Sequence, residues 1–300
     1  MKAFYSDRFA LPLPEGHRFP MAKYSLLRQQ ALAQGILNAR QLVEPQAVTE
    51  EELTLVHTPV YVSSVLGGTL SPQAMRRIGF PWSPALVERS RRSVGGTLCA
   101  GRAALQDGVA VNLAGGTHHA FPDYGAGFCV FNDVAVAARA LQREGAVRRV
   151  VVLDCDVHQG DGTAAIFLGD PAVFTFSIHG ARNYPFRKQC SDLDIELEDG
   201  TEDAVYLQAL QRGVERALEL AHADLAFYLA GADPFVGDRL GRLALTKEGL
   251  ATRDWIVLEM CRQRGVPVAV VMAGGYAHQI QDIVDIHLMT IRLATEFAGV

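Results

Sequence analysis

The chain has 300 residues, of which 49% are hydrophobic and 20% charged, values typical of globular domains with a sizeable core. Its formal net charge of −5 gives no reason to expect nucleic acid as a partner, because proteins that bind the phosphate backbone carry basic patches. Five cysteines without a C-x-x-C pair argue against a disulfide framework, and we expect a cytoplasmic protein. Neither a signal peptide nor an apolar run of about 18 residues is evident, so no membrane association is expected.

The first third of the chain is predicted to be mainly helical. A short strand is expected over residues 2–5, followed by a proline-marked loop over 11–20 and an irregular segment over 67–84. Helices are expected over 22–33, over 50–66 with a break at Pro59 and Thr58 as a possible N-cap, and over 84–106.

From residue 109 onward, apolar runs rich in β-branched residues alternate with helical stretches. Strands are predicted over 109–113, 150–156, 173–178, 225–229 and 266–272, and helices over 132–144, 163–168, 202–221, 247–264 and 279–297. This alternation favours an α/β fold with a mostly parallel sheet covered by helices on both faces. No low-complexity linker or fixed-period repeat divides the sequence, so a single domain over residues 1–300 is expected.

Small residues and a chemically active side chain follow each of these five strands. The polar side chains at these ends are His118 and His119, then Asp154, Asp156 and His158, then Ser177 and His179, then Asp233, and finally Tyr276. In open α/β sheets, ligands bind beyond the carboxyl ends of the strands. The sequence therefore predicts one functional site at that edge of the sheet.

Asp154, Asp156 and His158 suggest a metal centre within this site. They alternate along the continuation of an apolar strand, so we expect their side chains to point the same way. Buried carboxylates and imidazoles are costly unless something pairs with them, and Asp and His are common zinc ligands. Asp233, a lone carboxylate at the end of another strand, is the best further ligand. Asp156, His158 and Asp233 would leave positions open for water and substrate, with Asp154 behind them.

The adjacent residues His118 and His119 fit general acid–base chemistry better than joint binding of one ion. Each needs a carboxylate on its other ring nitrogen, and Asp154 and Asp161 are available. Tyr276, preceded by two glycines, could place its hydroxyl on a developing oxyanion. Each residue alone also has a structural interpretation; Asp161, for example, could simply cap the next helix. Their joint position at the strand ends favours hydrolysis of an unactivated carbonyl such as an amide.

These motifs together resemble the zinc-dependent histone deacetylase family, in its order and over roughly residues 1–295. They are Gly115-Gly116-Thr117-His118-His119, Gly127-Phe128-Cys129 with Asn132-Asp133, Asp154-Cys155-Asp156-Val157-His158-Gln159-Gly160-Asp161, Ala230-Gly231-Ala232-Asp233 and Gly274-Gly275-Tyr276. The stretches 200–203, 237–241 and 253–254 look most like the class IV (eleventh human type) branch and its bacterial relatives.

The resemblance implies the arginase–deacetylase fold and one catalytic Zn²⁺ on Asp156, His158 and Asp233. By this resemblance His119 matches the general base, which later acts as the acid, and Asp161 matches the carboxylate that orients it. His118, paired with Asp154, matches the electrostatic histidine of the family. Tyr276 matches the residue that polarises the carbonyl. Gly127 and Phe128 match a wall of the acyl-lysine tunnel. The family also implies a structural K⁺ near the zinc, and the matching positions are Asp154, Asp156, His158, Ser177 and Ile178.

Two departures from the family pattern stand out. Gln159 replaces a histidine found in many members, and the loop over 180–190 lacks the commoner phenylalanine-rich form. We expect Tyr184 or Phe186 to supply the second tunnel wall. The acyl chain that this tunnel prefers is therefore left open.

The expected function is zinc-dependent hydrolysis of acyl-lysine or of a similar acylated amine. The alternatives are a deacylase of acylpolyamines or other small amides, a manganese ureohydrolase of the related arginase fold, and an acyl-group sensor without turnover. A binuclear manganese site needs more Asp and His ligands than the motifs supply, and the presence of His119, Asp161 and Tyr276 argues against a sensor. The sequence does not indicate the acyl chain, the amine or the oligomeric state.

Overall fold

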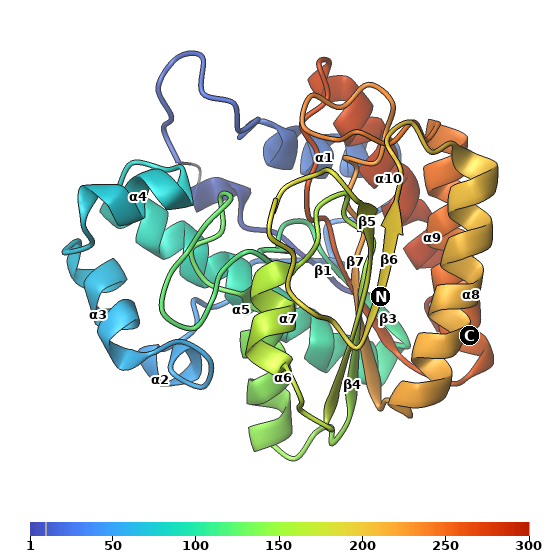
Figure 1. Cartoon of the computed structure of the whole chain (residues 1–300), viewed down its shortest axis with the longest axis horizontal. Coiled ribbons are helices and arrows are strands. Elements are labelled where there is room, and N and C mark those ends of the chain that lie inside the picture. The colour runs from blue at the N-terminus through green and yellow to red at the C-terminus, as the bar shows by residue number, and fades with distance from the viewer. Residues whose placement is uncertain (10, 300) are drawn as a thin grey trace.

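The structure is a computed structural model that describes residues 1–9 and 11–299 (Figure 1). Within them, eight strands form one sheet in the order β2-β1-β3-β8-β7-β4-β5-β6, and all neighbouring strands are parallel. The strands are β1 (Ala3–Phe4), β2 (Leu42–Val43), β3 (Val109–Asn112), β4 (Val150–Asp154), β5 (Val173–Gly180), β6 (Leu193–Leu197), β7 (Leu225–Leu229) and β8 (Val268–Val271). The predicted α/β fold with a parallel sheet is confirmed.

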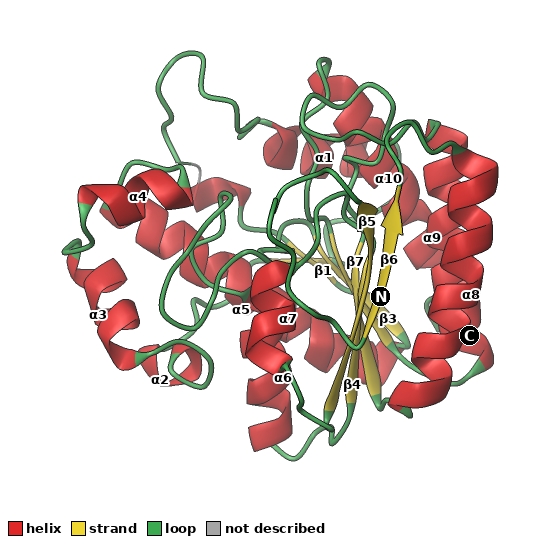
Figure 2. Cartoon of the chain, in the orientation of Figure 1, coloured by secondary structure: helices red, strands yellow, loops and turns green. Residues whose placement is uncertain are grey.

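Helices cover both faces of this sheet (Figure 2). Helices α5 (Pro84–Asp107), α6 (Asp133–Arg143) and α7 (Asp161–Phe167) lie on one side, and α1 (Lys23–Ala33), α8 (Asp203–Ala221), α9 (Lys247–Gln263) and α10 (Ile280–Phe297) on the other. The short helices α2 (Glu50–Leu53), α3 (Pro59–Gly67) and α4 (Pro72–Ile78) stand beside α5, away from the sheet. A 3-10 turn, η1, covers Asp7–Phe9.

Strand β4 shows why the apolar runs become central strands. Val151 and Leu153 belong to the core beneath α8, α9 and α10, whereas Val150 and Val152 belong to the core beneath α5 and α6. Successive side chains point to opposite faces of a sheet, so a strand that is covered on both faces must be apolar at every position. All five residues of β4 are buried, and the run ends with Asp154 at the carboxyl end of the strand.

Some predictions about local structure were wrong. The segment over 67–84 is not irregular throughout, because Ser71 caps the backbone of Ala74 and Pro72 opens helix α4. The strand expected over 150–156 ends at Asp154, and the sequence reading missed the edge strands β2 and β6. Thr58, in contrast, caps α3 as predicted, by accepting a hydrogen bond from the Tyr61 amide.

The topology brings the predicted site residues to one place. Strands β4 and β7 are neighbours in the middle of the sheet, with Asp154 paired to Leu229 at their carboxyl ends. The loops that follow them carry Asp156 and Asp233, and the loops after β3 and β8 carry the histidine pair and Tyr276. Among the described residues, no helix is both long and apolar enough to cross a membrane.

Candidate active site

Asp156, His158 and Asp233 form a compact, buried group whose ligand atoms all lie within 4.8 Å of one another. The Nδ1 atom of His158 lies 2.9 Å from Oδ1 of Asp156 and 3.3 Å from Oδ2 of Asp233. Strand alternation does not bring them together, because the chain turns directly after Asp154. Backbone hydrogen bonds fix the turn instead: the Val157 amide donates to Asp233 and the His158 amide to Asp156.

The electrostatics of this group suit a divalent cation. Burial lowers the pKa of His158, but the two carboxylates around Nδ1 outweigh it and raise that pKa to about 10. Burial and the charge of Asp156 raise the pKa of Asp233 to about 7. Oδ2 of Asp233 is buried and has no hydrogen-bond partner. Two carboxylates and one imidazole balance a divalent charge with the donor atoms that zinc prefers, so these residues fit a Zn²⁺ ion.

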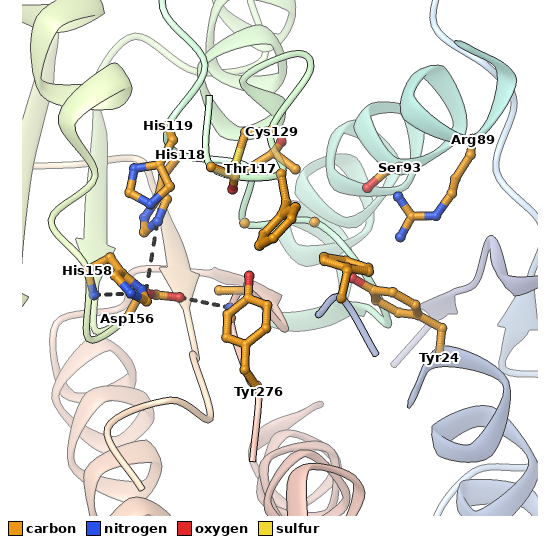
Figure 3. Close-up of a pocket in the computed structure, with 17 residues that line it drawn as sticks. Tyr24, Arg89, Ser93, Thr117, His118, His119, Cys129, Asp156, His158 and Tyr276 are labelled. Atoms are coloured by element: carbon orange, nitrogen blue, oxygen red, sulfur yellow. Dashed lines mark hydrogen bonds and ion pairs between the residues drawn. The ribbon is translucent and has the colours of Figure 1, made fainter. Parts of the chain in front are cut away.

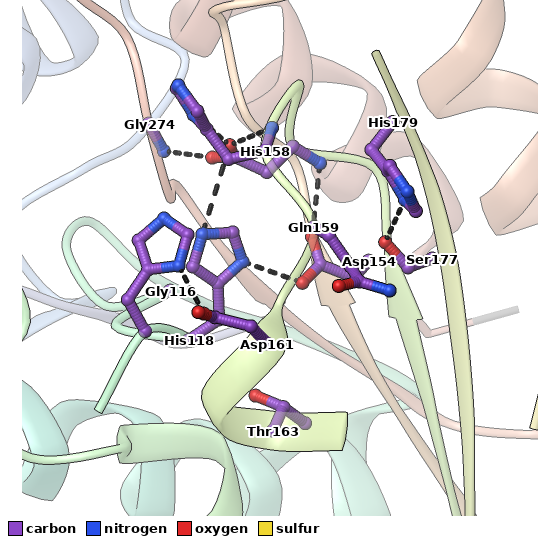
Figure 4. A network of polar contacts seen from close by, with 12 residues as sticks. Gly116, His118, Asp154, His158, Gln159, Asp161, Thr163, Ser177, His179 and Gly274 are labelled. Atoms are coloured by element: carbon purple, nitrogen blue, oxygen red, sulfur yellow. Dashed lines mark hydrogen bonds and ion pairs between the residues drawn. The ribbon is translucent and has the colours of Figure 1, made fainter. Parts of the chain in front are cut away.

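His118 and His119 lie beside this group, with ring centroids 4.2 Å apart (Figure 3). Figure 4 shows the contact between His118 and Asp154. Nδ1 of His118 lies 2.7 Å from Asp154, and Nδ1 of His119 lies 2.6 Å from Asp161. Because each carboxylate accepts the Nδ1 proton, Nε2 of each ring is left to face the cavity. Both predicted carboxylate–histidine pairs are present in the structure.

The two histidines differ in their protonation. Burial tends to lower the pKa of His118, but Asp154 and Asp156 raise it to about 9, which favours a charged ring. Burial and the neighbouring charge of His118 lower the pKa of His119 to about 4, although Asp161 opposes this. A neutral His119 can accept a proton at Nε2 near pH 7, whereas a charged His118 can only donate hydrogen bonds.

Tyr276 lies across the cavity from the histidines, with its hydroxyl directed into the space between them (Figure 3). Burial, followed by the charges of Asp233 and Asp156, raises the pKa of its phenol well above the ordinary value, so the hydroxyl remains a donor. The Tyr276 amide donates to Asp238 at 2.6 Å, and its carbonyl accepts from Arg239 at 2.8 Å. The sequence indicated Asp238 and Arg239 only as part of the stretch 237–241 and gave neither of them a role at the site.

Two more buried side chains hold the site from behind. Lys23, 2% exposed, lies 5.4 Å from the centre of the Tyr276 ring, and its ammonium is close to the carbonyls of Ala273 and Gly275. Arg253, 0% exposed, donates to the carbonyl of Gly231 at 2.6 Å and also contacts that of Cys155 at 3.3 Å. These carbonyls lie in the loops that carry Asp233 and Asp156, shortly before each of those residues. Arg253 is itself paired with Asp254 at 2.8 Å.

Phe128 and Gly127 form one wall of the approach to the site. Gly127 has φ +54°, and a Cβ there would lie 2.6 Å from the ring of His119, so a side chain would displace the histidine. Phe128 has φ 67°, an unfavourable conformation for a bulky residue, and its amide donates to the Ile78 carbonyl at 2.8 Å. Both residues line a deep cavity of about 40 Å³ that also reaches Asp156 and Tyr276.

A wider outer cavity of about 470 Å³ opens above the deep one and shares His119, Phe128 and Tyr276 with it. Tyr184 lines the outer cavity and packs edge-on against His119, with ring centroids 4.9 Å apart. Phe186 also lines it but is 83% exposed. Tyr184 is therefore better placed than Phe186 to face Phe128 across the approach.

The Histone deacetylase domain family matches residues 17–291 of this chain. The chain belongs to the histone deacetylase family. An uncharacterized protein of Picosynechococcus sp. is 49% identical over 97% of both chains, and Histone deacetylase 2 of Arabidopsis thaliana is 29% identical over 87% of this chain and 70% of its own length. The crystal structure of a histone deacetylase homologue from Aquifex aeolicus superposes with a TM-score of 0.84 at 25% identity, over 99% of this chain and 84% of that one.

Gln159 and Ser177 make further contacts around the site of this histone deacetylase family chain. Nε2 of Gln159 donates to the carbonyl of Gln189 at 2.7 Å and to Asp194 at 2.9 Å, so it anchors the loop over 180–190 to strand β6. Ser177 pairs with Asp154 across β4 and β5, and its hydroxyl lies 2.9 Å from Nδ1 of His179. The K⁺ site that includes Ser177 and Ile178 stays a prediction.

Proposed function

We propose that this histone deacetylase family chain is a zinc-dependent amidohydrolase that removes an acyl group from acyl-lysine or a similar acylated amine, with residues 1–300 as one catalytic domain. The observation that carries the proposal is the neutral, carboxylate-held His119 directly beside the Asp156–His158–Asp233 group. A donor hydroxyl on Tyr276 completes the arrangement. Together they supply a cation site, a base and an oxyanion donor in one cavity.

Asp156, His158 and Asp233 would hold the zinc. When bound, the ion supplies Lewis-acid polarisation of the acyl carbonyl and lowers the pKa of a water molecule to about 7. Asp154 would hold His118, whose charge stabilises negative charge that develops in the cavity. Phe128 and Tyr184 would flank the aliphatic part of the substrate and exclude water from it.

His119 and Tyr276 would carry out the proton and carbonyl chemistry. Nε2 of His119 takes a proton from the water as its oxygen attacks the acyl carbon, and Asp161 holds the ring through Nδ1 and stabilises the positive charge that results. The Tyr276 hydroxyl donates a hydrogen bond to the oxygen that becomes negative. His119 then returns the proton to the amine nitrogen as the carbon–nitrogen bond breaks.

A panel of acyl-lysine peptides tests this proposal. The acyl groups should run from acetyl to long-chain and include trifluoroacetyl, with purified protein and added zinc. We expect at least one of them to be hydrolysed to the carboxylic acid and a peptide with an unmodified lysine, and no hydrolysis by His119→Ala at equal zinc content. Binding of the panel without turnover by the parent protein would favour a sensor instead.

The related manganese ureohydrolase function is distinguished by metal content. Among the described residues, a single group of three acidic and histidine ligands is gathered closely enough to hold an ion. We therefore expect one zinc per active chain; two manganese ions per chain together with urea release from a guanidino substrate would support the alternative. A parallel assay of acylated polyamines separates peptide from small-amide substrates.

A further inference from the structure

The outer cavity is lined by positively charged side chains that have no role in the proposed hydrolysis. Five arginines line it, and we call them the arginine rim: Arg18, Arg77, Arg182, Arg239 and Arg242. No Asp or Glu lines this cavity in the part of the chain that the structure describes. Because the chain as a whole has a net charge of −5, the rim is opposite in sign to the protein that carries it.

Four separate segments bring these arginines together. Arg18 lies in the loop before α1, Arg77 in α4 and Arg182 in the loop after β5, while Arg239 and Arg242 lie in the loop after β7. All five side chains are exposed. Their convergence on one opening is therefore a property of the fold and not of a local run of basic sequence.

Most of the rim charge is not compensated by acidic side chains. Arg242 pairs with Asp199 at 3.1 Å, but within the described residues the other four have no carboxylate within 4.0 Å. Arg77 stacks over the ring of Tyr124 at 4.6 Å, and Arg239 donates to carbonyl oxygens only. Neutral partners orient a guanidinium without cancelling its charge, so the rim keeps a strong positive potential.

The arginine rim lies where the amine side of a bound substrate would be. His119, Phe128 and Tyr276 line both cavities, so a substrate whose carbonyl reaches His119 and Tyr276 leaves its amine side in the outer cavity. Resting on the proposed function, we propose that the substrate carries negative charge on the amine side of the scissile bond. That charge comes from acidic residues that flank an acyl-lysine, or from a carboxylate or phosphate on a small acylated amine. Guanidinium groups bind both anions through paired hydrogen bonds.

Matched substrates test this inference. One pair consists of acetyl-lysine peptides that differ only in flanking aspartates or flanking lysines; a second consists of N-acetyl-phosphoethanolamine and N-acetylethanolamine. At low salt we expect kcat/KM for the acidic peptide to exceed that for the basic peptide by at least about tenfold, with the ratio shrinking as salt screens the rim. A preference confined to the phosphate compound would identify a small anionic amine as the source of the charge.

The double variant Arg18→Gln/Arg182→Gln removes two rim charges that make no side-chain hydrogen bond to the catalytic residues. We expect it to reduce the acidic-to-basic ratio at least about threefold, mainly through KM. Arg212→Gln, an exposed arginine on α8 outside the rim, should leave the ratio unchanged. Equal rates for both members of each pair, or a preference for the basic peptide, would overturn the inference.

Binding separates this inference from the proposed function. The same peptides, labelled for fluorescence anisotropy, report on the rim even if no substrate is hydrolysed. Tighter binding of the acidic peptide that is lost in the double variant would support the rim while the proposed hydrolysis fails. Hydrolysis with no charge preference in rate or binding would leave the proposed function standing and reject the inference.

Discussion

The Nδ1 atom of His119 lies 2.6 Å from Oδ1 of Asp161, and this bond decides which ring nitrogen faces the substrate. An amide in place of the carboxylate can present its NH₂ group and favour the wrong tautomer. We expect Asp161→Asn to lower kcat by up to roughly 10⁴-fold, the scale for losing the carboxylate that sets the tautomer of a catalytic histidine. Steady-state kinetics on the best acyl-lysine peptide measure this, with zinc content and melting temperature as controls. Unchanged kcat would remove the orienting role from Asp161.

Tyr276→Phe removes one hydroxyl and leaves the ring in place. Loss of a single oxyanion donor lowers turnover by roughly 10²–10³-fold. We expect that fall in kcat with little change in KM, because the hydroxyl acts mainly on charge that develops during the reaction. Near-parental activity in the same assay would exclude Tyr276 from carbonyl polarisation.

Asp156→Ala removes one of the two carboxylates that surround Nδ1 of His158. We expect the variant to contain no zinc by elemental analysis, and the stabilisation that added zinc confers on the parent protein to disappear in thermal melts. Glu219→Gln, which removes an exposed carboxylate on α8, should keep full occupancy. A fully loaded Asp156→Ala protein would show that the ion is held elsewhere.

We expect His57 to make the free energy of unfolding depend on pH, independently of any catalytic activity. Its Nε2 accepts a hydrogen bond from the Asn132 amide at 3.0 Å, and its Nδ1 lies 2.9 Å from the Phe121 carbonyl, so the buried ring is neutral. Burial lowers the pKa of His57 to about 4, although the backbone hydrogen bond to Phe121 opposes this. The unfolded chain therefore binds more protons between pH 6.5 and 4. The contribution of the neutral His57 ring to the free energy of unfolding is therefore complete above pH 6.5 and is lost as the pH falls toward 4.

His57→Gln can keep both hydrogen bonds without titrating. Between pH 7 and pH 4 we expect the free energy of unfolding to fall in both proteins, but by roughly 3 kcal/mol less in the variant than in the parent protein. Urea denaturation at a series of pH values gives the difference between the two proteins, which cancels the other titrating groups they share. Parallel curves for the two proteins would show that His57 does not set this dependence.

The site residues that directly follow an apolar run could be predicted from the sequence. The apolar runs before Asp154 and Asp233 mark buried strands, and the parallel sheet then places their carboxyl ends together. Asp156 and His158, however, do not continue the alternation of strand β4. A tight turn after Asp154, fixed by hydrogen bonds to side chains, brings them together. The alternation of side chains along a β-strand does not indicate where such a turn occurs.

Other features depend on contacts between distant segments. Lys23 reaches the Tyr276 loop across 250 positions, and the rim arginines gather from four loops or helix ends. An isolated basic residue in a loop most often lies in solvent, so no local pattern marks these positions. Strands β2 and β6 were missed for a similar reason: they are short or only half-buried edge strands with a weak apolar signal.

Arg253 makes the proposed metal site depend on a buried residue of helix α9, outside both cavities of the site. From helix α9 its guanidinium joins the backbone before Asp156 to the backbone before Asp233. The spacing of these two proposed ligands is thus held partly by a helix that covers the sheet. We therefore expect that a design which moves these two loops onto another parallel sheet needs a buried guanidinium at the position of Arg253 as well.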